Sequence, residues 1–286
     1  MIKHTWILIL ALPLILFAAV ALNAQTRDYR QTETIIKKLL DKPKAAPAEN
    51  TGSASGTASA NEDLTSNKTV AEPNADAVLL KTGLSMFNSG SYTAAEKNFS
   101  KLISEYPDSP YTDTARIRLG QIYIKENEYD KAMETFAEVN EFSGEYPAAL
   151  FDTGYCLNAK TDVTSAISCY QTVAYSFPDH ELADDALVRA GLLFLQTGKG
   201  SEALSTFIDV VSKYKNRETV DESVFYMAKV YEQDAGLRDI ERARDIYKLF
   251  LKKAAAGEKH FANSPLKERA ERELARINST YFRIKE

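Results

Sequence analysis

Residues that commonly perform catalysis or bind metals are few in this sequence. Its 286 residues include only three histidines and two cysteines. His4 lies near the N-terminus, directly before an apolar run, and His180 and His260 are far apart, so the histidines provide neither a metal-binding spacing nor a catalytic triad. Glycines such as Gly198 and Gly200 follow no predicted strand and match no phosphate-binding loop. The sequence therefore predicts a protein that is not an enzyme and that needs no cofactor or metal.

An excess of charge of one sign is also lacking. The formal net charge is −5, and Lys, Arg, Asp and Glu are interspersed along the chain. A nucleic-acid-binding protein normally carries a basic patch or stripe, and none is visible here. We therefore do not expect nucleic acid as a partner.

Only one long apolar run is present, at residues 6–22, and it follows Lys3 and precedes small residues that end at Ala24. This order is typical of a signal peptide over residues 1–24, with cleavage after Ala21 or Ala24. An uncleaved anchor formed by residues 5–22 is the alternative, because a spanning helix needs roughly 20 residues. Both alternatives export residues 25–286. No cysteine follows the run, so a lipid-anchored lipoprotein of the usual bacterial type is not expected.

Two segments separate this run from a folded domain. Residues 25–41 are predicted to contain a short amphipathic helix, because aliphatic residues recur at helical spacing at Ile35, Ile36, Leu39 and Leu40. Residues 42–75 are rich in Ala, Ser, Thr, Gly, Asn and Pro. They have too few apolar residues to offset the entropy cost of ordering, so we expect a flexible linker.

A pattern of small and aromatic residues then occurs five times, at intervals of 34 or 37 residues. Each unit has a small residue, an alanine after it, an aromatic four residues beyond the alanine, and an apolar residue three further on. The small residues are Gly83, Gly120, Gly154, Gly191 and Ala228; the alanines are Ala95, Ala132, Ala166, Ala203 and Ala243; the aromatics are Phe99, Phe136, Tyr170, Phe207 and Tyr247. In the fifth unit, three residues are inserted near residues 235–237.

This spacing predicts two helices in each unit. The small residue and the alanine let the two helices approach closely, and the aromatic fills the space around that contact. One helix pair cannot bury its apolar face alone, so the pairs stack into a solenoid. We predict an all-α solenoid over residues 76–252. A capping helix and tail are predicted for residues 253–286, where one helical face carries Leu266, Ala270, Leu274 and Ile277.

The unit resembles the tetratricopeptide repeat (TPR), a helix–turn–helix of 34 residues. The resemblance covers about residues 76–252 and implies a right-handed α-solenoid. Residues 106–111 (YPDSPY) and 175–179 (YSFPD) are similar to the phrases that link units in TPR proteins of the bacterial envelope. That group includes the YbgF-type accessory proteins of Tol–Pal and the BamD-like outer-membrane assembly proteins. The resemblance implies a periplasmic protein that binds other proteins.

In this family the first helix of each unit lines the inner surface. We predict that this surface is a groove for an amphipathic helix or an extended peptide, with Phe151 and Tyr155 as central anchors. The alternative is that its apolar side chains pack against neighbouring helices. The predicted groove residues are Leu84, Phe87, Ile117, Ile124, Phe151, Tyr155, Val188, Leu192 and Leu195, together with Leu80, Gln121, Asn158, Phe225, Lys229 and Glu232. Residues 27–41 of the same chain are a candidate ligand.

Two further pairs of residues allow more than one interpretation. Cys156 and Cys169 lie on the two predicted helices of the third unit, and they form either a disulfide or two small buried hydrophobic side chains. Asp184 and Asp185 are expected at a helix start, where acidic side chains are favourable, with a cation site as the alternative.

These observations predict a non-enzymatic scaffold that holds one or more proteins of the bacterial envelope. A role alongside Tol–Pal, outer-membrane assembly or cell-division machinery is what the resemblance implies. The alternative function is a structural or surface protein of the envelope that self-associates. A membrane would be a partner only through residues 5–22, and the sequence specifies no oligomeric state.

Overall fold

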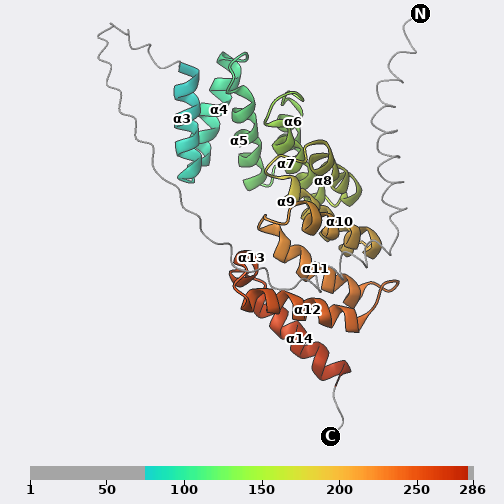
Figure 1. The fold of residues 1–286 in the computed structure, drawn as a ribbon. Coiled ribbons are helices and arrows are strands. Elements are labelled where there is room, and N and C mark those ends of the chain that lie inside the picture. Colours follow the sequence, from blue (N-terminus) through green and yellow to red (C-terminus); the bar gives the residue numbers. More distant parts are fainter. Residues whose placement is uncertain (1–74, 283–286) are drawn as a thin grey trace, which may run out of the picture.

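The computed structural model describes residues 75–282, and within this range the chain forms twelve helices and no strand. Ten of the helices form five pairs, each pair being one unit (Figure 1). The pairs are α3 (Ala75–Asn88) with α4 (Tyr92–Glu105), α5 (Thr112–Lys125) with α6 (Tyr129–Ala137), α7 (Tyr146–Ala159) with α8 (Val163–Ser176), α9 (Ala183–Gln196) with α10 (Gly200–Lys213), and α11 (Thr219–Gln233) with α12 (Ile240–Ala255). The short α13 (Lys259–Ala262) and then α14 (Lys267–Tyr281) follow.

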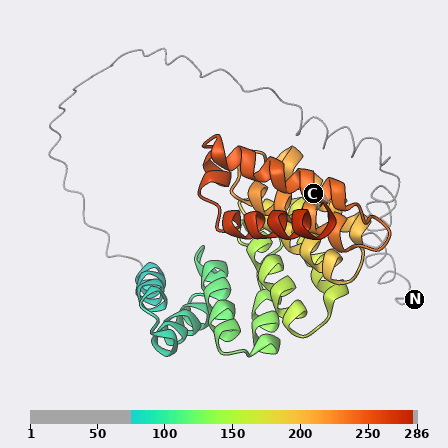
Figure 2. The same ribbon diagram turned by 90° about the horizontal axis from the view of Figure 1, so that it is seen from below.

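The predicted all-α solenoid is confirmed by the way these pairs stack. The second helix of each unit packs against the first helix of the next, and α14 packs against α12 in the same manner. Seen along a second direction, the units follow a curved path from α3 to α12 (Figure 2). The predictions for residues 1–24, 25–41 and 42–74 lie outside the described residues.

Glycine–aromatic contacts hold the two helices of a unit together, as the repeat pattern predicted. A Cβ atom added to Gly120 would lie 2.3 Å from the ring of Phe136, and one added to Gly83 would lie 2.5 Å from the ring of Phe99. In the fifth unit, Ala228 and the aromatic Tyr247 are both fully buried. At Gly83 and Gly120 the two helices of a unit therefore pass too closely for a larger side chain, whereas the fifth unit accommodates alanine at the same position.

The turn inside each unit differs in length only where the sequence predicted an insertion. Three residues join the two helices in units one to four, whereas residues 234–239 join α11 to α12. Asp234 organises this longer turn. Its Oδ1 accepts hydrogen bonds from the backbone N–H groups of Gly236 (2.9 Å) and Leu237 (3.0 Å), and its Oδ2 accepts one from Gly200 (3.0 Å).

The hydrophobic core is unevenly distributed along the solenoid. A single cluster of buried side chains extends from Ala166 to Ile277, across α8 to α14. Two smaller clusters serve the first three units, and α3 itself buries only Asp76 and Gly83. None of the helices in residues 75–282 is both long and apolar enough to cross a membrane.

Candidate functional site: the first-helix face

The predicted groove residues lie on the first helices of the units. We call the surface formed by α3, α5, α7 and α9 the first-helix face. Within it, α3 contacts α5, and α5 contacts α7. Most of the predicted residues are half-buried and pack against the core, as Leu84, Phe87, Ile124, Phe151, Leu192 and Leu195 do. Tyr155 differs from them, because 48% of its surface is exposed.

Phe151 and Tyr155, the two predicted anchors, have different environments although both lie on α7. The ring of Phe151 makes an edge-to-face contact with the buried ring of Tyr170, with centroids 5.2 Å apart. Phe151 therefore belongs largely to the internal packing of its unit. Tyr155 lies one turn further along the same helix and presents its ring to solvent. Of the pair, Tyr155 is the side chain that a partner can reach.

Among the predicted groove residues on α3, α5, α7 and α9, two are not on the surface. Ile117 and Val188 are each only 2% exposed. Ile117 belongs to a buried cluster with Ala132, Phe136 and Ala149, so it fills the contact between units two and three. Val188 belongs to the large C-terminal cluster. The prediction that these two residues line a groove is therefore wrong, because the curved stacking of the units closes over them.

A chain of polar residues crosses the first-helix face; the groove prediction included Gln121 but not its partners Arg118 and Asp152. The guanidinium of Arg118 lies over the ring of Phe87, 5.8 Å from its centroid, and donates a hydrogen bond to Gln121 (2.9 Å). Gln121 in turn donates to Asp152 on α7 (2.9 Å). Burial raises the pKa of the Asp152 carboxyl above its ordinary value. This chain joins α3, α5 and α7, and it adds charged groups to a face that was predicted to bind through apolar anchors.

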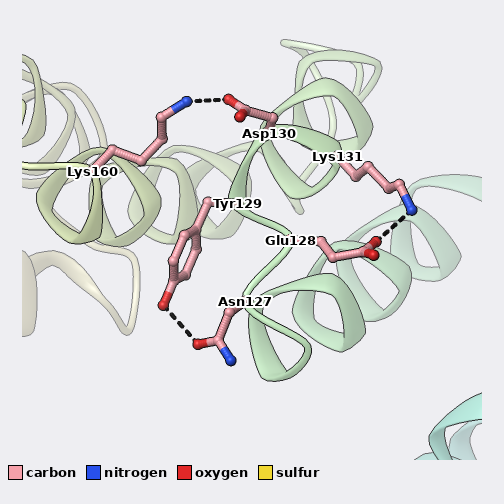
Figure 3. A pocket seen from close by; sticks show the side chains of 6 residues that line it. All are labelled: Asn127, Glu128, Tyr129, Asp130, Lys131 and Lys160. Atoms are coloured by element: carbon pink, nitrogen blue, oxygen red, sulfur yellow. Dashed lines mark hydrogen bonds and ion pairs between the residues drawn. The ribbon is translucent and has the colours of Figure 1, made fainter.

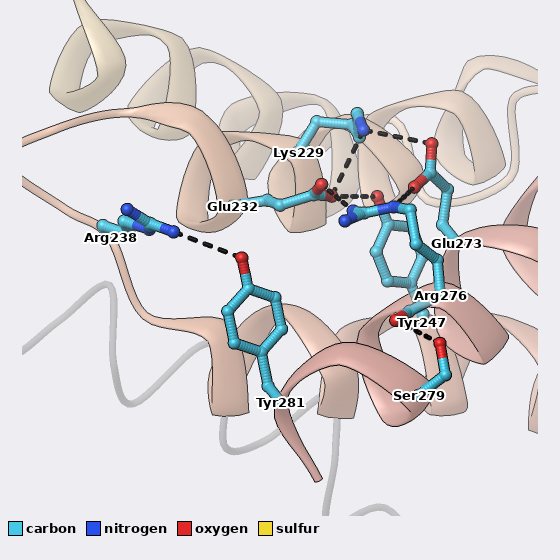
Figure 4. Close-up of polar contacts among 8 residues, drawn as sticks. All are labelled: Lys229, Glu232, Arg238, Tyr247, Glu273, Arg276, Ser279 and Tyr281. Atoms are coloured by element: carbon cyan, nitrogen blue, oxygen red, sulfur yellow. Dashed lines mark hydrogen bonds and ion pairs between the residues drawn. The ribbon is translucent and has the colours of Figure 1, made fainter. Parts of the chain in front are cut away.

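In the fifth unit, the corresponding surface of α11 is covered by α14. Glu273 accepts a hydrogen bond from Lys229 on α11 (3.2 Å) and another from Arg276 (2.9 Å), and Arg276 also pairs with Glu232 (Figure 4). The guanidinium of Arg269 lies 5.0 Å from the centroid of Phe225. The predicted groove positions Phe225, Lys229 and Glu232 are therefore used to hold the capping helix.

The two cysteines are free thiols, so the disulfide alternative is not what the structure shows. Cys156 is buried and Cys169 is partly buried. Burial raises the pKa of Cys156 to about 12 and that of Cys169 to about 11. Both thiols are therefore protonated near neutral pH, which suits small hydrophobic side chains and does not suit nucleophiles or metal ligands.

Asp184 and Asp185 lie in the first turn of α9, as expected for residues at a helix start. Asp184 is buried, and its Oδ2 accepts a hydrogen bond from Thr219 of the next unit (2.8 Å). No group of three or more His, Cys, Asp or Glu side chains capable of holding a metal ion occurs within residues 75–282. The carboxylate of Asp184 therefore serves as a link between units four and five.

A shallow hollow of about 360 Å³ lies where the turn of unit two faces Lys160 of unit three (Figure 3). Its charged side chains pair with one another: Lys131 with Glu128 (2.5 Å), and Lys160 with Asp130. The hydroxyl of Tyr129 donates to Asn127 (3.0 Å). The hollow is thus lined by polar groups that already have partners, and it links two turns.

Comparison with known proteins agrees with this fold. A family model described as a tetratricopeptide repeat-like domain matches residues 5–181. The chain belongs to this family. No curated protein sequence matches the chain. Since TPR-like domains are interaction modules, the family and the stacked helix pairs together indicate a protein–protein interaction scaffold.

Several solved structures resemble the TPR-like chain in fold. A MamA protein is 17% identical with a TM-score of 0.52, over 64% of this chain and 94% of that one. PilF of Pseudomonas aeruginosa is 17% identical with a TM-score of 0.50, over 73% and 94%. Kinesin light chain TPR-like repeats of Podosopora anserina are 13% identical with a TM-score of 0.52, over 66% and 98%. At these identities the likeness concerns the fold alone.

Proposed function

We propose that this TPR-like protein is a non-enzymatic scaffold of the bacterial envelope that binds an amphipathic helix or extended peptide of another envelope protein on its first-helix face. The observation that carries the proposal is the exposed ring of Tyr155, placed among half-buried apolar side chains on a face formed by consecutive units. Tyrosine is enriched at protein interfaces, because its ring supplies apolar area and its hydroxyl a hydrogen bond.

The polar chain across the face defines what kind of ligand fits. A partner segment would place apolar side chains against Tyr155 and the exposed edges of Leu192 and Leu195. Arg118 on α5 and Asp152 on α7, which are linked through Gln121 on the same face, offer one charge of each sign. An amphipathic helix with an apolar stripe and mixed charges at its edge matches this surface, whereas a purely apolar or strongly basic segment does not.

The envelope location rests on the N-terminal sequence. Residues 1–24 have the order of an export signal, and the family model begins at residue 5, directly before the apolar run. A family domain that includes this run favours a retained anchor over residues 5–22, with residues 25–286 in the periplasm. The linking phrase at residues 106–111 supports a role near Tol–Pal or outer-membrane assembly. Fractionation followed by N-terminal sequencing tests this: release of a soluble chain beginning at residue 22 or 25 would exclude the anchor.

The binding surface is tested by crosslinking in intact cells, followed by mass spectrometry. We expect the substitution Tyr155→Arg to remove the partner that the native chain captures, without lowering the melting temperature, because the ring is half exposed. The matched control is Phe142→Arg, which changes a ring that is 89% exposed in the loop between α6 and α7. Loss of the partner in the Phe142 variant but not in the Tyr155 variant would move the interface to that loop.

The rival function, self-association, predicts a different outcome. In that case the crosslinked partner of the native chain is a second copy, and light scattering shows oligomers that grow with concentration. A monomer across the concentrations present in cells, with a different protein in the crosslink, supports the scaffold.

A further inference from the structure

One side of α3 is open, although the same side is covered in every later unit. Val78 is 45% exposed, whereas the residues at its position in the following units are buried: Ala115 (0%), Ala149 (2%), Ala186 (0%) and Ser223 (0%). Ser85 is likewise exposed, whereas its equivalents Ile122, Cys156, Leu193 and Val230 are buried. In those units the covering element is the second helix of the preceding unit. Within residues 75–282, no helix precedes α3.

We call this surface the open α3 face and define it by Ala75, Val78, Thr82 and Ser85. These four residues are uncharged and small, so a helix can approach the backbone of α3 closely. The other end of the solenoid is different, because α14 covers it with a charged outer surface. Terminal repeats of solenoids normally carry such a polar cap. The open α3 face therefore lacks the cover that the rest of the fold leads us to expect.

The sequence upstream contains a segment with the spacing of a second helix. In all five units, the residue before the second helix is followed eight residues later by a buried aromatic and eleven residues later by a buried apolar residue, as with Ser91, Phe99 and Leu102. Asp28, Ile36 and Leu39 have the same spacing. The match extends to the neighbouring positions: Tyr29 corresponds to Tyr92, Glu33 to Glu96, Lys38 to Lys101 and Leu40 to Ile103.

The differences between the two segments are also informative. Thr32 replaces the alanine of the repeat, and Ile36 replaces the aromatic. In the described units, the alanine and the aromatic pack against the first helix of the same unit, as Phe99 packs against Gly83. A second helix that only covers the next unit needs neither of them. Asp28 stands where Asp162 and Asp239 accept hydrogen bonds from the first turns of α8 and α12.

From this match we infer that residues 28–41 form a half-repeat that packs on the open α3 face of the same chain, as α4 packs on α5. Leu39 and Leu40 would cover Val78. Residues 42–74 would span about 30 Å as a flexible chain, more than the roughly 21 Å length of a 14-residue helix, so the segment can reach this face. Because this connection is short, the effective concentration of residues 28–41 at the open α3 face is high. This contact is separate from the first-helix face and does not depend on the proposed function.

Hydrogen exchange of the full-length chain tests the inference. We expect the amides of residues 30–41 to exchange at least about tenfold more slowly than an unstructured segment. The substitution Val78→Asp should remove this protection while the exchange of α5 to α14 stays unchanged, because Val78 is exposed in the folded domain. Leu39→Asp should act in the same way. Thr34→Asp is its matched control, because residue 34 lies on the opposite side of the helix.

Three results would overturn the inference. Protection that survives Val78→Asp but disappears with Tyr155→Asp would place the segment on the first-helix face. Protection that rises with protein concentration, together with a dimer by light scattering, would mean that the open α3 face binds a second copy. Exchange at the unstructured rate in the native chain would mean that the segment does not dock.

Discussion

At the residue scale, units one to four depend on close contacts between a glycine and an aromatic ring. The four glycines of the first helices face aromatic rings, but they differ in how tightly they fit. A Cβ atom would lie 2.3 Å from a ring atom at Gly120 and 3.0 Å at Gly154. Phe136, which faces Gly120, is almost completely buried and cannot move without disturbing the contact with the next unit. The distance between the added Cβ atom and the ring should therefore determine how much a glycine-to-alanine substitution destabilises the protein.

We predict that Gly120→Ala destabilises the protein by about 2 kcal/mol, because the methyl group overpacks the contact with Phe136. Gly154→Ala should destabilise the protein less, since an added Cβ atom there would lie farther from the facing ring. Gly144→Ala is the control, because an added Cβ there meets no atom within 4 Å. Urea denaturation of the three variants measures the differences. Equal stability of the Gly120 and Gly144 variants would contradict the prediction.

A second prediction concerns Asp152, whose pKa is raised by burial even though Gln121 and Arg118 favour its charged form. When folding raises the pKa of an acid, the free energy of unfolding falls as the pH rises through that pKa. The change in free energy of unfolding caused by Asp152→Asn should therefore be more favourable at pH 7 than at pH 4.

Asp162 gives the opposite case, because hydrogen bonds from Ser165 lower its pKa. The change caused by Asp162→Asn should be more favourable at pH 4, and thermal unfolding at both pH values tests both signs.

The residues whose environment the sequence predicted are those that repeat. Gly83 and Phe99 recur in phase in later units, so their packing role follows from the period alone. Ile117 and Val188 lie at groove positions by the same period, yet they are buried. Their burial depends on how far each unit is rotated relative to the next. The spacing of residues within one unit does not carry information about that rotation. Arg118 and Asp152 were missed for a related reason, because their contacts join three different units.

At the scale of elements, α14 shows how a solenoid end is closed. The apolar stripe of Ala270 and Ile277 predicted that this helix would pack, and both residues are fully buried. The ion cluster around Lys229 was not predictable from local sequence, because its partner Glu273 is 44 residues away. Lys229 itself is only 7% exposed, and it lies between the carboxylates of Glu232 and Glu273. Removing its charge would leave two partly buried acids with only Arg276 between them.

We predict that Lys229→Met destabilises the C-terminal units by about 3 kcal/mol, because it leaves carboxylates unpaired in a buried site. The double variant Lys229→Met with Glu273→Met should recover part of that loss, since one unpaired acid is removed as well. Arg272→Met is the control, because the pair of Arg272 with Glu268 is exposed and should contribute less than about 1 kcal/mol. Hydrogen exchange of α14 and urea denaturation measure these effects. A destabilisation of the Lys229 variant no larger than that of the control would show that the cluster is not needed.

At the scale of the whole molecule, burial increases from the N-terminal to the C-terminal units. One buried cluster joins α8 to α14, whereas units one and two depend on the cluster around Phe99, Leu102 and Ile122. In a solenoid each unit contacts only its neighbours, so stability is a sum of local terms and need not be uniform. A protein with this distribution should open from α3 inward, with the last units opening at the highest free energy.

This gradient gives the final prediction, which hydrogen exchange at increasing urea concentrations can measure. The amides of α3 to α6 should become exposed at lower urea than those of α9 to α12. Leu102→Ala, which removes about 3 kcal/mol of packing, should speed exchange in α3 to α6 and leave α9 to α12 unchanged. Phe207→Ala should speed exchange throughout, because Phe207 is fully buried in the large cluster on which the earlier units stack. Simultaneous exchange of all helices in the native chain, or an equal response of both halves to Leu102→Ala, would instead indicate a single cooperative unit. In that case the first-helix face would be lost all at once, and partner binding would stabilise α3 and α12 equally.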